Sequence, residues 1–172
     1  MLIIFLLKEH DVFLLQGSNK ENKKKYLDQS LIFISDEIGK VIKISSYFES
    51  EAWNMKNFSI FYNRAIHIKT NYSPIDLLKK ILNIEFLIGR RKNSCQGEYQ
   101  NREIDIDILF YDHIMIYSFI LKIPHPLLHL RRFVLEPMCE IAPNKSHPIF
   151  NLTILEILGL CMDELYVKKI SK

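Results

Sequence analysis

The sequence predicts an α+β domain in which helices pack on one face of an antiparallel sheet and long loops lie over the other face. Its 172 residues are enough to bury one full hydrophobic core. Short apolar segments with a period of two alternate with longer segments whose apolar residues recur every three or four positions, which indicates strands and helices. Their order is strand, helix, strand, strand, helix, strand, followed by a helical C-terminal part. That order is the split-βαβ, ferredoxin-like arrangement.

The composition is that of a globular protein, with 48% hydrophobic and 25% charged residues. The net charge of +3 suits an anionic ligand but does not require nucleic acid, because the Lys and Arg residues are spread along the chain. The three cysteines form no C-x-x-C pair. Neither a zinc site nor a disulfide framework is therefore expected, and a reducing cytoplasmic location is. We expect a single domain over residues 1–172 that acts as a monomer.

Residues 1–10 form an apolar lead-in, either a short extra strand or a disordered segment. The apolar stretch from Met1 to Leu7 is far shorter than the about 20 residues that span a bilayer, and it lacks the pattern of a signal peptide. The first strand is expected over residues 12–16, followed by a helix that Ser18 or Asn19 caps. That helix reaches Ile38 and ends at Gly39. A second strand over 40–48, a long loop over 49–57 and a third strand over 59–69 come next.

Pro74 begins the second expected helix, because its missing N–H costs little in a first turn. The apolar stripe of this helix is assigned to Ile75, Leu78, Leu82, Phe86 and Ile88, and the helix reaches Gly89. Residues 90–101 form a second long loop, and long loops without a pattern are often lids over binding sites. The remaining elements are a strand over 102–111, a tight turn at Asp112-His113, a short strand over 114–117, and helices over 132–140 and 153–165.

Two aspartates in the strand that ends at Tyr111 indicate a metal site. Ile104, Ile106, Ile108 and Phe110 are predicted to face the core, while Asp105 and Asp107 face the opposite side. Aspartate is depleted in strands, so two of them on one face need a reason. Carboxylates at i and i+2 lie roughly 6.5–7 Å apart and can both reach a pair of magnesium ions ~3.5–4 Å apart. The alternative is a solvated sheet face.

Other side chains can converge on the same face. Phe61 and Asn63 share it on the third strand, where Phe61 and Phe133 can hold a flat ring and Asn63 can bind its edge. The candidate phosphate-binding groups are Arg90, Arg102, Arg131 and His125. Taken one at a time, each has an ordinary structural explanation. Glu85 is by default a surface carboxylate or an Arg partner, and Trp53 can anchor its loop without touching a ligand.

Several of these motifs together resemble the 6-hydroxymethyl-7,8-dihydropterin pyrophosphokinase family of folate biosynthesis. The resemblance runs from about Val12 to Pro143. It is carried by these segments: Gly17-Ser18-Asn19, Arg90, Arg102-Glu-Ile-Asp105-Ile-Asp107-Ile-Leu-Phe-Tyr111, Pro124-His125-Pro126, Arg131-Arg-Phe133-Val-Leu-Glu-Pro137 and Glu140-Ile-Ala-Pro143. The aspartate strand followed by Pro-His-Pro is the most specific pair among them.

The resemblance implies magnesium-dependent transfer of the β,γ-pyrophosphoryl group of ATP to the hydroxymethyl oxygen of the pterin, releasing AMP. Asp105 and Asp107 would hold two magnesium ions, and Arg90 and Arg102 would stabilise charge on the phosphates. The other implied ATP-binding residues are Glu85, His125 and Arg131. The implied pterin-binding residues are Asn19, Ser50, Glu51, Trp53, Phe61, Asn63 and Phe133.

The chain departs from the family pattern at several positions. Gln16 stands where an apolar residue usually precedes Gly17, and Tyr99-Gln100-Asn101 stands where Trp-Gly-Pro is common. Lys92 replaces an arginine often seen two residues after Arg90. Two other functions stay open: a single-stranded RNA-binding module on the same kind of sheet, with Phe61 as a stacking residue, and a former enzyme that now serves as an interaction protein. The aspartates argue against the first, because they would repel a phosphate chain.

Overall fold

The computed structural model describes residues 8–53, 59–90 and 101–170. Three predicted segments therefore lie partly outside the described residues: the apolar lead-in over 1–10 and the long loops over 49–57 and 90–101. Lys92, Cys95 and residues 99–100 lie entirely outside them. Within the described part, no helix is long and apolar enough to cross a membrane.

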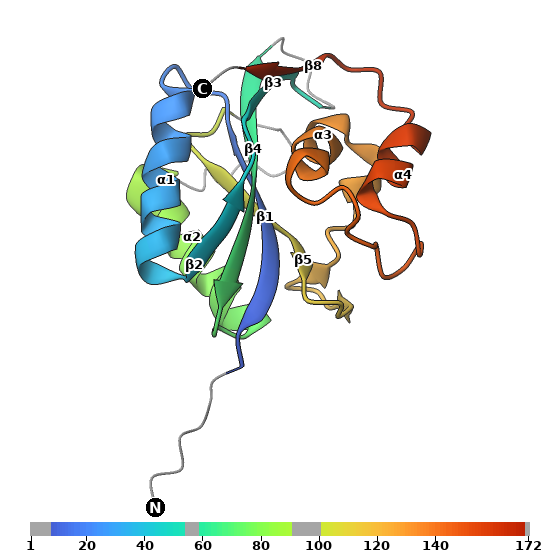
Figure 1. The fold of residues 1–172 in the computed structure, drawn as a ribbon. Coiled ribbons are helices and arrows are strands. Elements are labelled where there is room, and N and C mark those ends of the chain that lie inside the picture. Colours follow the sequence, from blue (N-terminus) through green and yellow to red (C-terminus); the bar gives the residue numbers. More distant parts are fainter. Residues whose placement is uncertain (1–7, 54–58, 91–100, 171–172) are drawn as a thin grey trace, which may run out of the picture.

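An antiparallel six-stranded sheet forms the centre of the molecule (Figure 1). Its strands lie in the order β5-β1-β4-β3-β8, and β2 pairs with the other end of β4. Their bounds are β1 His10–Ser18, β2 Lys40–Ile44, β3 Tyr47–Glu51, β4 Ile60–Thr70, β5 Asp105–Tyr111 and β8 Val167–Ile170. The hairpin of β6 (Ile116–Tyr117) and β7 (Lys122–Ile123) forms a separate small sheet. The predicted fold class, an α+β domain with an antiparallel ferredoxin-like sheet, is confirmed.

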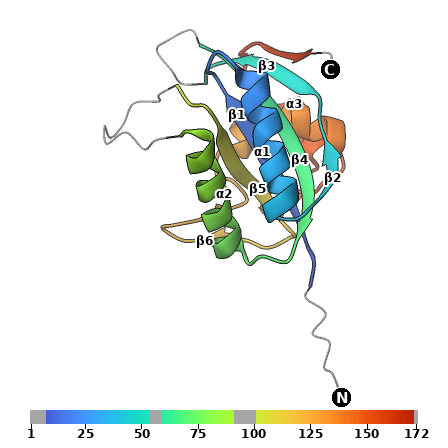
Figure 2. The ribbon, with the colours of Figure 1, turned by 90° about the vertical axis from the view of Figure 1, so that its left-hand side faces the viewer.

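Two helices, α1 (Lys23–Glu37) and α2 (Pro74–Ile88), cover one face of the sheet, as expected (Figure 2). They enclose a core with alternate residues of the central strands, such as Val12, Leu14, Ile66 and Ile108. The apolar stripe predicted for α2 is wrong at Ile75, Leu82 and Phe86, which are exposed, whereas Ile88 is buried and Leu78 packs against the core. The residues that α2 buries are Leu77, Ile81, Ile84, Glu85 and Ile88. This helix carries two interleaved apolar stripes, so the helical period alone does not select the inner one.

The other face is only partly covered by loops, because α3 (Arg132–Ile141) and α4 (Ile154–Leu160) also pack there (Figure 1). They form a second core with Phe13, Leu15 and Ala65, the residues that point away from α1 and α2. The short helix η1 (Leu128–Leu130) leads into α3. Helices therefore lie on both faces, and the second pair stands beside the open part of the sheet.

The buried ring of His147 gives this second core a pH dependence. It stacks on Phe150 at a centroid distance of 4.4 Å and meets Phe110 edge-on at 5.6 Å. Burial lowers the pKa of His147 to about 4, below its ordinary value of 6.5. His147 binds a proton more readily in the unfolded chain than in the folded protein. The free energy of unfolding should therefore decrease as the pH falls from 6.5 to about 4, by roughly 3 kcal/mol at most. Urea unfolding of the wild type and of His147→Phe across this range measures the effect. An equal loss of stability in both proteins would contradict it.

The predicted strand over 40–48 is interrupted, and β3 extends into the expected loop as far as Glu51. Ser45 and Ser46 separate the two strands. The Ser45 hydroxyl oxygen accepts a hydrogen bond from the backbone N–H of Ala65 at 2.9 Å, and both the N–H and the hydroxyl of Ser46 donate to Glu140 on α3. Side-chain hydrogen bonds thus supplement the backbone bond from the Ser45 N–H to the Ala65 carbonyl at 2.9 Å, which the sequence pattern did not indicate.

The prediction that Phe110 faces the same side as Ile104, Ile106 and Ile108 is wrong. The strand pairing shifts at this point, since Phe13 pairs with Phe110 while Leu14 pairs with Ile108, so Leu109 is an extra residue in β5. Such a bulge reverses the side-chain alternation beyond it. Phe110 therefore packs in the core under α3 and α4, and Tyr111 takes the other side.

The remaining differences lie at element ends. The first helix begins at Lys23, so Ser18 and Asn19 do not cap it; Ser18 belongs to β1. The helix predicted over 153–165 ends at Leu160 and is followed by the unpredicted strand β8, which pairs with β3. Thr153 caps α4 with a capping box that includes Glu156, which accounts for the correctly predicted start.

Candidate active site

A pocket opens on the sheet face beside α3. Its empty space, the open solvent at the mouth included, is about 550 Å³. Strands β1, β3, β4 and β5 form its floor, and the segment from η1 into α3 forms one wall. It is lined by Leu15, Gly17, Ser50, Glu51, Trp53, Phe61, Asn63, Arg102, Asp105, Asp107, Arg131 and Phe133. Most of the predicted site residues are therefore brought together, and Leu15 and Gly17 join them.

The first aspartate of β5 is held by arginines from both ends of the long loop. The Asp105 carboxylate accepts a hydrogen bond from Arg90 at 2.7 Å and a further one from Arg102. Arg90 also pairs with Glu85 of α2, whose carboxylate accepts the backbone N–H of Ile106 at 2.8 Å. Burial raises the pKa of Glu85 to about 6, although Arg90 opposes the shift. Glu85 does not line the pocket, and it positions Arg90 and the start of β5.

The second aspartate, Asp107, lies deeper along the same strand. Burial and the neighbouring Asp105 raise the pKa of its carboxyl group to about 7, while the charges of Arg131 and Arg102 oppose the shift. In the described part of the chain, no hydrogen bond or ion pair of the Asp107 side chain is found. A carboxylate in this environment gains most from a nearby positive charge.

Arg131 forms the aromatic end of the pocket together with Trp53 and Phe133. Its guanidinium carbon lies 4.7 Å from the Trp53 ring centroid and 5.7 Å from that of Phe133, distances typical of cation–π contacts. The Arg131 side chain is buried, and its Nε atom has no hydrogen-bond partner among the described residues. Since a buried N–H without a partner is costly, this donor is suited to an acceptor on a ligand.

Asn63 and Phe61 occupy the adjoining floor. The Asn63 side chain is buried, and its Nδ2 donates to Ser50 Oγ at 2.8 Å. Gly17 pairs with Asn63 across the strands, and a Cβ atom there would stand 3.2 Å from Asn63 Oδ1. The absent side chain at Gly17 thus leaves the amide edge of Asn63 open toward the pocket. Gly17 is not among the site residues predicted from the sequence.

His125 does not line the pocket, but it lies close enough for the charges of Arg131 and Asp105 to affect the pKa of its ring. Its backbone N–H donates to the Leu109 carbonyl at 3.0 Å, and its Nδ1 accepts the N–H of Leu127 at 3.2 Å. Burial and Arg131 lower the pKa of His125 to about 4. The ring is therefore neutral at pH 7, and Nε2 carries the proton as a donor.

Asn19 and Glu51 lie at the margins of the site. The Asn19 side chain is not part of the lining. Its Oδ1 accepts the N–H of Arg102 at 2.7 Å, and its Nδ2 donates to Asn101 and to Ser59. Glu51 lines the pocket, and its carboxylate accepts the N–H of Tyr166 from the C-terminal segment at 3.0 Å. Asn19 thus ties the residues that enter β5 to the end of β1.

Two carboxylates and several arginines stand beside a pocket with aromatic walls, an arrangement suited to a transferase that acts on phosphate-bearing substrates. The family model of 7,8-dihydro-6-hydroxymethylpterin-pyrophosphokinase matches residues 13–143. A 2-amino-4-hydroxy-6-hydroxymethyldihydropteridine pyrophosphokinase of Aquifex aeolicus is 38% identical over 145 residues, covering 84% of this chain and 88% of that protein. The folic acid synthesis protein fol1 of Pneumocystis carinii is 36% identical over 152 residues, which cover 88% of this chain and 20% of that protein.

Solved structures agree in fold. A Plasmodium falciparum HPPK-DHPS triple mutant superposes with a TM-score of 0.73 at 19% identity, covering 89% of this chain and 44% of that one. The wild-type protein with pteroate gives 0.70 at 17% identity, and the chain again matches less than half of that protein. The chain belongs to the 7,8-dihydro-6-hydroxymethylpterin pyrophosphokinase family. It transfers pyrophosphate to hydroxymethyldihydropterin, a step of folate biosynthesis.

The contacts of Asn19 lead to a prediction for this reaction. Asn19→Ala should lower kcat/KM by about tenfold, because the N–H of Arg102 loses its acceptor and the arginine is less well held. Steady-state kinetics with both substrates varied measures the effect. Asn22→Ala is the matched control, since Asn22 is an exposed residue nearby whose side chain makes no cap hydrogen bond to α1. An Asn19→Ala enzyme with wild-type constants would contradict the prediction.

Proposed function

We propose that the transferred group is the β,γ-pyrophosphoryl group of ATP, that the reaction requires two magnesium ions held by Asp105 and Asp107, and that AMP is the second product. The observation that carries the proposal is the pair of carboxylates on one strand at the floor of the pocket, of which Asp107 forms no ion pair with a described residue. The ions would neutralise charge on the triphosphate and orient it.

The donor set fits magnesium. Mg²⁺ prefers a few carboxylate oxygens and completes its shell with phosphate and water. Burial favours the protonated form of Asp107, and a divalent cation beside it would restore the ionised form. The guanidinium groups on Asp105 come from Arg90 and Arg102, and they stand where the phosphates would meet the carboxylate. We infer that they also bind the phosphates.

The chain supplies positioning and charge, and no side chain needs to act as a nucleophile. Arg131 offers the unpartnered Nε donor and its full charge to the triphosphate, while neutral His125 offers its Nε2 proton to a phosphate oxygen. The pterin ring would lie between Phe61 and Phe133, with Asn63 binding its edge. Ser50, Glu51 and Trp53 would line the remainder of that pocket, and Glu85 would hold Arg90 beside the nucleotide.

A direct assay tests the proposal. The purified protein is given ATP, Mg²⁺ and 6-hydroxymethyl-7,8-dihydropterin, and AMP and the pterin diphosphate are measured. We expect equimolar products and no turnover in EDTA. ADP in place of AMP, or turnover without a divalent cation, would contradict the proposal.

A second measurement addresses the interaction-protein alternative. Isothermal titration with a non-hydrolysable ATP analogue should show magnesium-dependent binding if the site is functional, and a folded protein that fails to bind would favour the alternative. We further propose that the enzyme is a cytoplasmic monomer, which gel filtration and cell fractionation test.

A further inference from the structure

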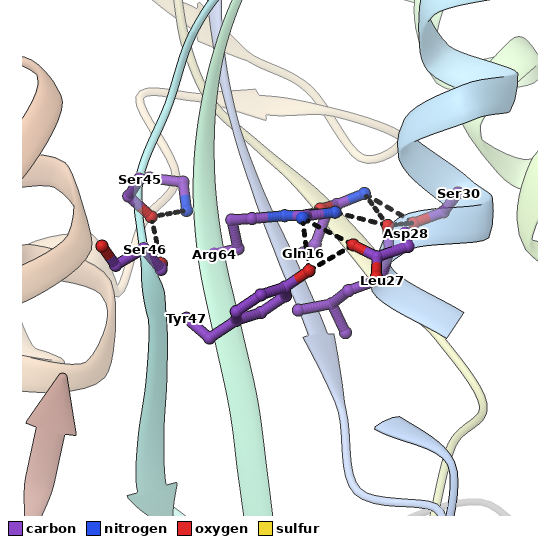
Figure 3. A network of polar contacts seen from close by, with 9 residues as sticks. Gln16, Leu27, Asp28, Ser30, Ser45, Ser46, Tyr47 and Arg64 are labelled. Carbon is purple, nitrogen blue, oxygen red and sulfur yellow. Dashed lines mark hydrogen bonds and ion pairs between the residues drawn. The ribbon is translucent and has the colours of Figure 1, made fainter. Parts of the chain in front are cut away.

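A buried polar network lies behind the pocket, on the sheet face that α1 covers (Figure 3). At the centre of the network lies Arg64 of β4, which is only 4% exposed. Its Nε donates to Gln16 Oε1 at 2.8 Å, its Nη1 donates to Asp28 at 2.9 Å and to the Tyr47 hydroxyl at 3.1 Å, and its Nη2 donates to the Leu27 carbonyl. Every nitrogen of the guanidinium is therefore engaged, and the partners come from β1, β3 and α1.

The network and the proposed pterin pocket lie on opposite faces of the same part of the sheet. Gln16 and Arg64 are cross-strand partners, and the next pair along the same strands is Gly17 and Asn63. Because side chains alternate between faces, the first pair points to α1 and the second pair points into the pocket. The arrangement continues in β3, where Tyr47 belongs to the core under α1. Its neighbour Phe48 pairs with Asn63.

The pocket side of this row connects the same three strands. Asn63 of β4 pairs with Gly17 of β1 and donates to Ser50 of β3 at 2.8 Å. A shift of a few tenths of an ångström between β1, β4 and β3 would therefore change the position of the Asn63 amide. The planar guanidinium of Arg64, itself on β4, donates hydrogen bonds to residues of β1, β3 and α1. These hydrogen bonds oppose such shifts.

The network places polar side chains where apolar residues could fill the core. Gln16 is fully buried and binds Arg64. Burying an arginine is costly, and replacing a buried ion pair by well-packed apolar residues is often neutral or favourable for stability. Fold stability is therefore a weak reason for this arrangement, whereas a fixed geometry at the pocket is a strong one.

We propose that Arg64 is a positioning residue for pterin binding, acting through Gln16 and Tyr47 on the pocket pair Gly17 and Asn63. This inference rests on the proposed function, in which Asn63 binds the edge of the pterin. Arg64 touches no substrate. It holds three strands and α1 in the alignment that the pterin requires, and the nucleotide half of the site does not depend on it.

The experiment separates pterin binding from catalysis and from folding. Arg64→Met keeps an unbranched, though shorter, side chain and removes the donors, Arg64→Lys keeps the charge without the fork, and Tyr47→Phe removes one hydroxyl. For Arg64→Met we expect the KM for pterin to rise by about 3- to 10-fold, the equivalent of one lost hydrogen bond, with kcat and the KM for ATP within about twofold. Arg64→Lys should lie between Arg64→Met and the wild type. Lys69→Met is the matched control, since Lys69 is a cation at the far end of β4.

Each possible result of this experiment either supports or contradicts the role proposed for Arg64. A lower unfolding midpoint with an unchanged pterin KM would show that Arg64 is merely structural, and parallel losses in kcat and both KM values would show general loosening; either overturns the proposal. Should Arg64→Met not fold, Arg64→Lys and Tyr47→Phe give the answer by the same split. Asn63→Ala is measured alongside. If it leaves the pterin KM unchanged, the proposed pterin site is wrong; if it raises the KM while the Arg64 variants do not, only the inference fails.

Discussion

Replacing Asp107 with alanine is expected to abolish pyrophosphate transfer, lowering kcat/KM by a factor on the order of 10³ or more. Asp107 is the member of the carboxylate pair that forms no ion pair with a described residue, and it lines the pocket floor beside Asp105. Removing it deletes one of the two proposed magnesium ligands. Because ionisation of Asp107 is disfavoured by burial, the variant should be no less stable than the wild type. Activity is measured by AMP formation and stability by urea unfolding.

A surface control makes this result specific. Asp36 lies exposed on α1, and Asp36→Ala should keep wild-type kinetics. Titration with Mg²⁺ and a non-hydrolysable ATP analogue should show weakened binding for Asp107→Ala alone. A variant that folds normally and retains near wild-type turnover would remove the metal assignment.

The second large effect is expected at Arg131. Arg131→Ala should lower kcat/KM by about 10²- to 10³-fold, because the site loses a buried charge and the unpartnered Nε donor. It also loses the cation–π contacts to Trp53 and Phe133. Arg131→Lys should recover only part of the activity, since an ammonium group restores the charge but neither the planar stacking nor the forked donors.

The neighbouring residue provides the control for this prediction. Arg132 is more exposed and pairs with Glu136 on the same helix at 3.1 Å, so Arg132→Ala should change the kinetics little. Full kinetic analysis of the three variants with both substrates varied is the measurement. Wild-type activity in Arg131→Lys would show that charge alone suffices, and wild-type activity in Arg131→Ala would exclude Arg131 from the site.

The sequence predicted the fold class and most of the pocket because local patterns carry that information. The period of two in β5 placed Asp105 and Asp107 on one face, and the same period in β4 placed Phe61 and Asn63 there. Since neighbouring strands of one sheet share their faces, these short-range patterns sufficed to bring distant residues together. Family motifs supplied Arg131, His125 and Phe133, whose position depends on the fold around them.

What could not be predicted depends on contacts between distant residues. The extra residue in β5 moved Phe110 to the other core without any Gly or Pro to mark it. The side of α2 that is buried was chosen by packing, because both of its stripes are apolar. Arg64 had no visible partner in the sequence, since Gln16, Asp28 and Tyr47 come from three separate elements. Strand β8 exists because β3 offers it an edge.

The bulge at Leu109 constrains how the length of this chain can change. Its carbonyl oxygen is freed from the strand ladder and accepts the N–H of His125, so the extra residue holds the Pro-His-Pro segment in place. Deleting Leu109 would restore a regular strand in which Phe110 and Tyr111 keep their faces, yet it would remove this acceptor and a buried side chain of the second core. The tip of the β6–β7 hairpin, between Tyr117 and Lys122, has no such role and is the place where insertions or deletions should be accepted. Changes in chain length at the tip of the β6–β7 hairpin, before Ile123, are thus compatible with the site. Changes at the Leu109 bulge are not.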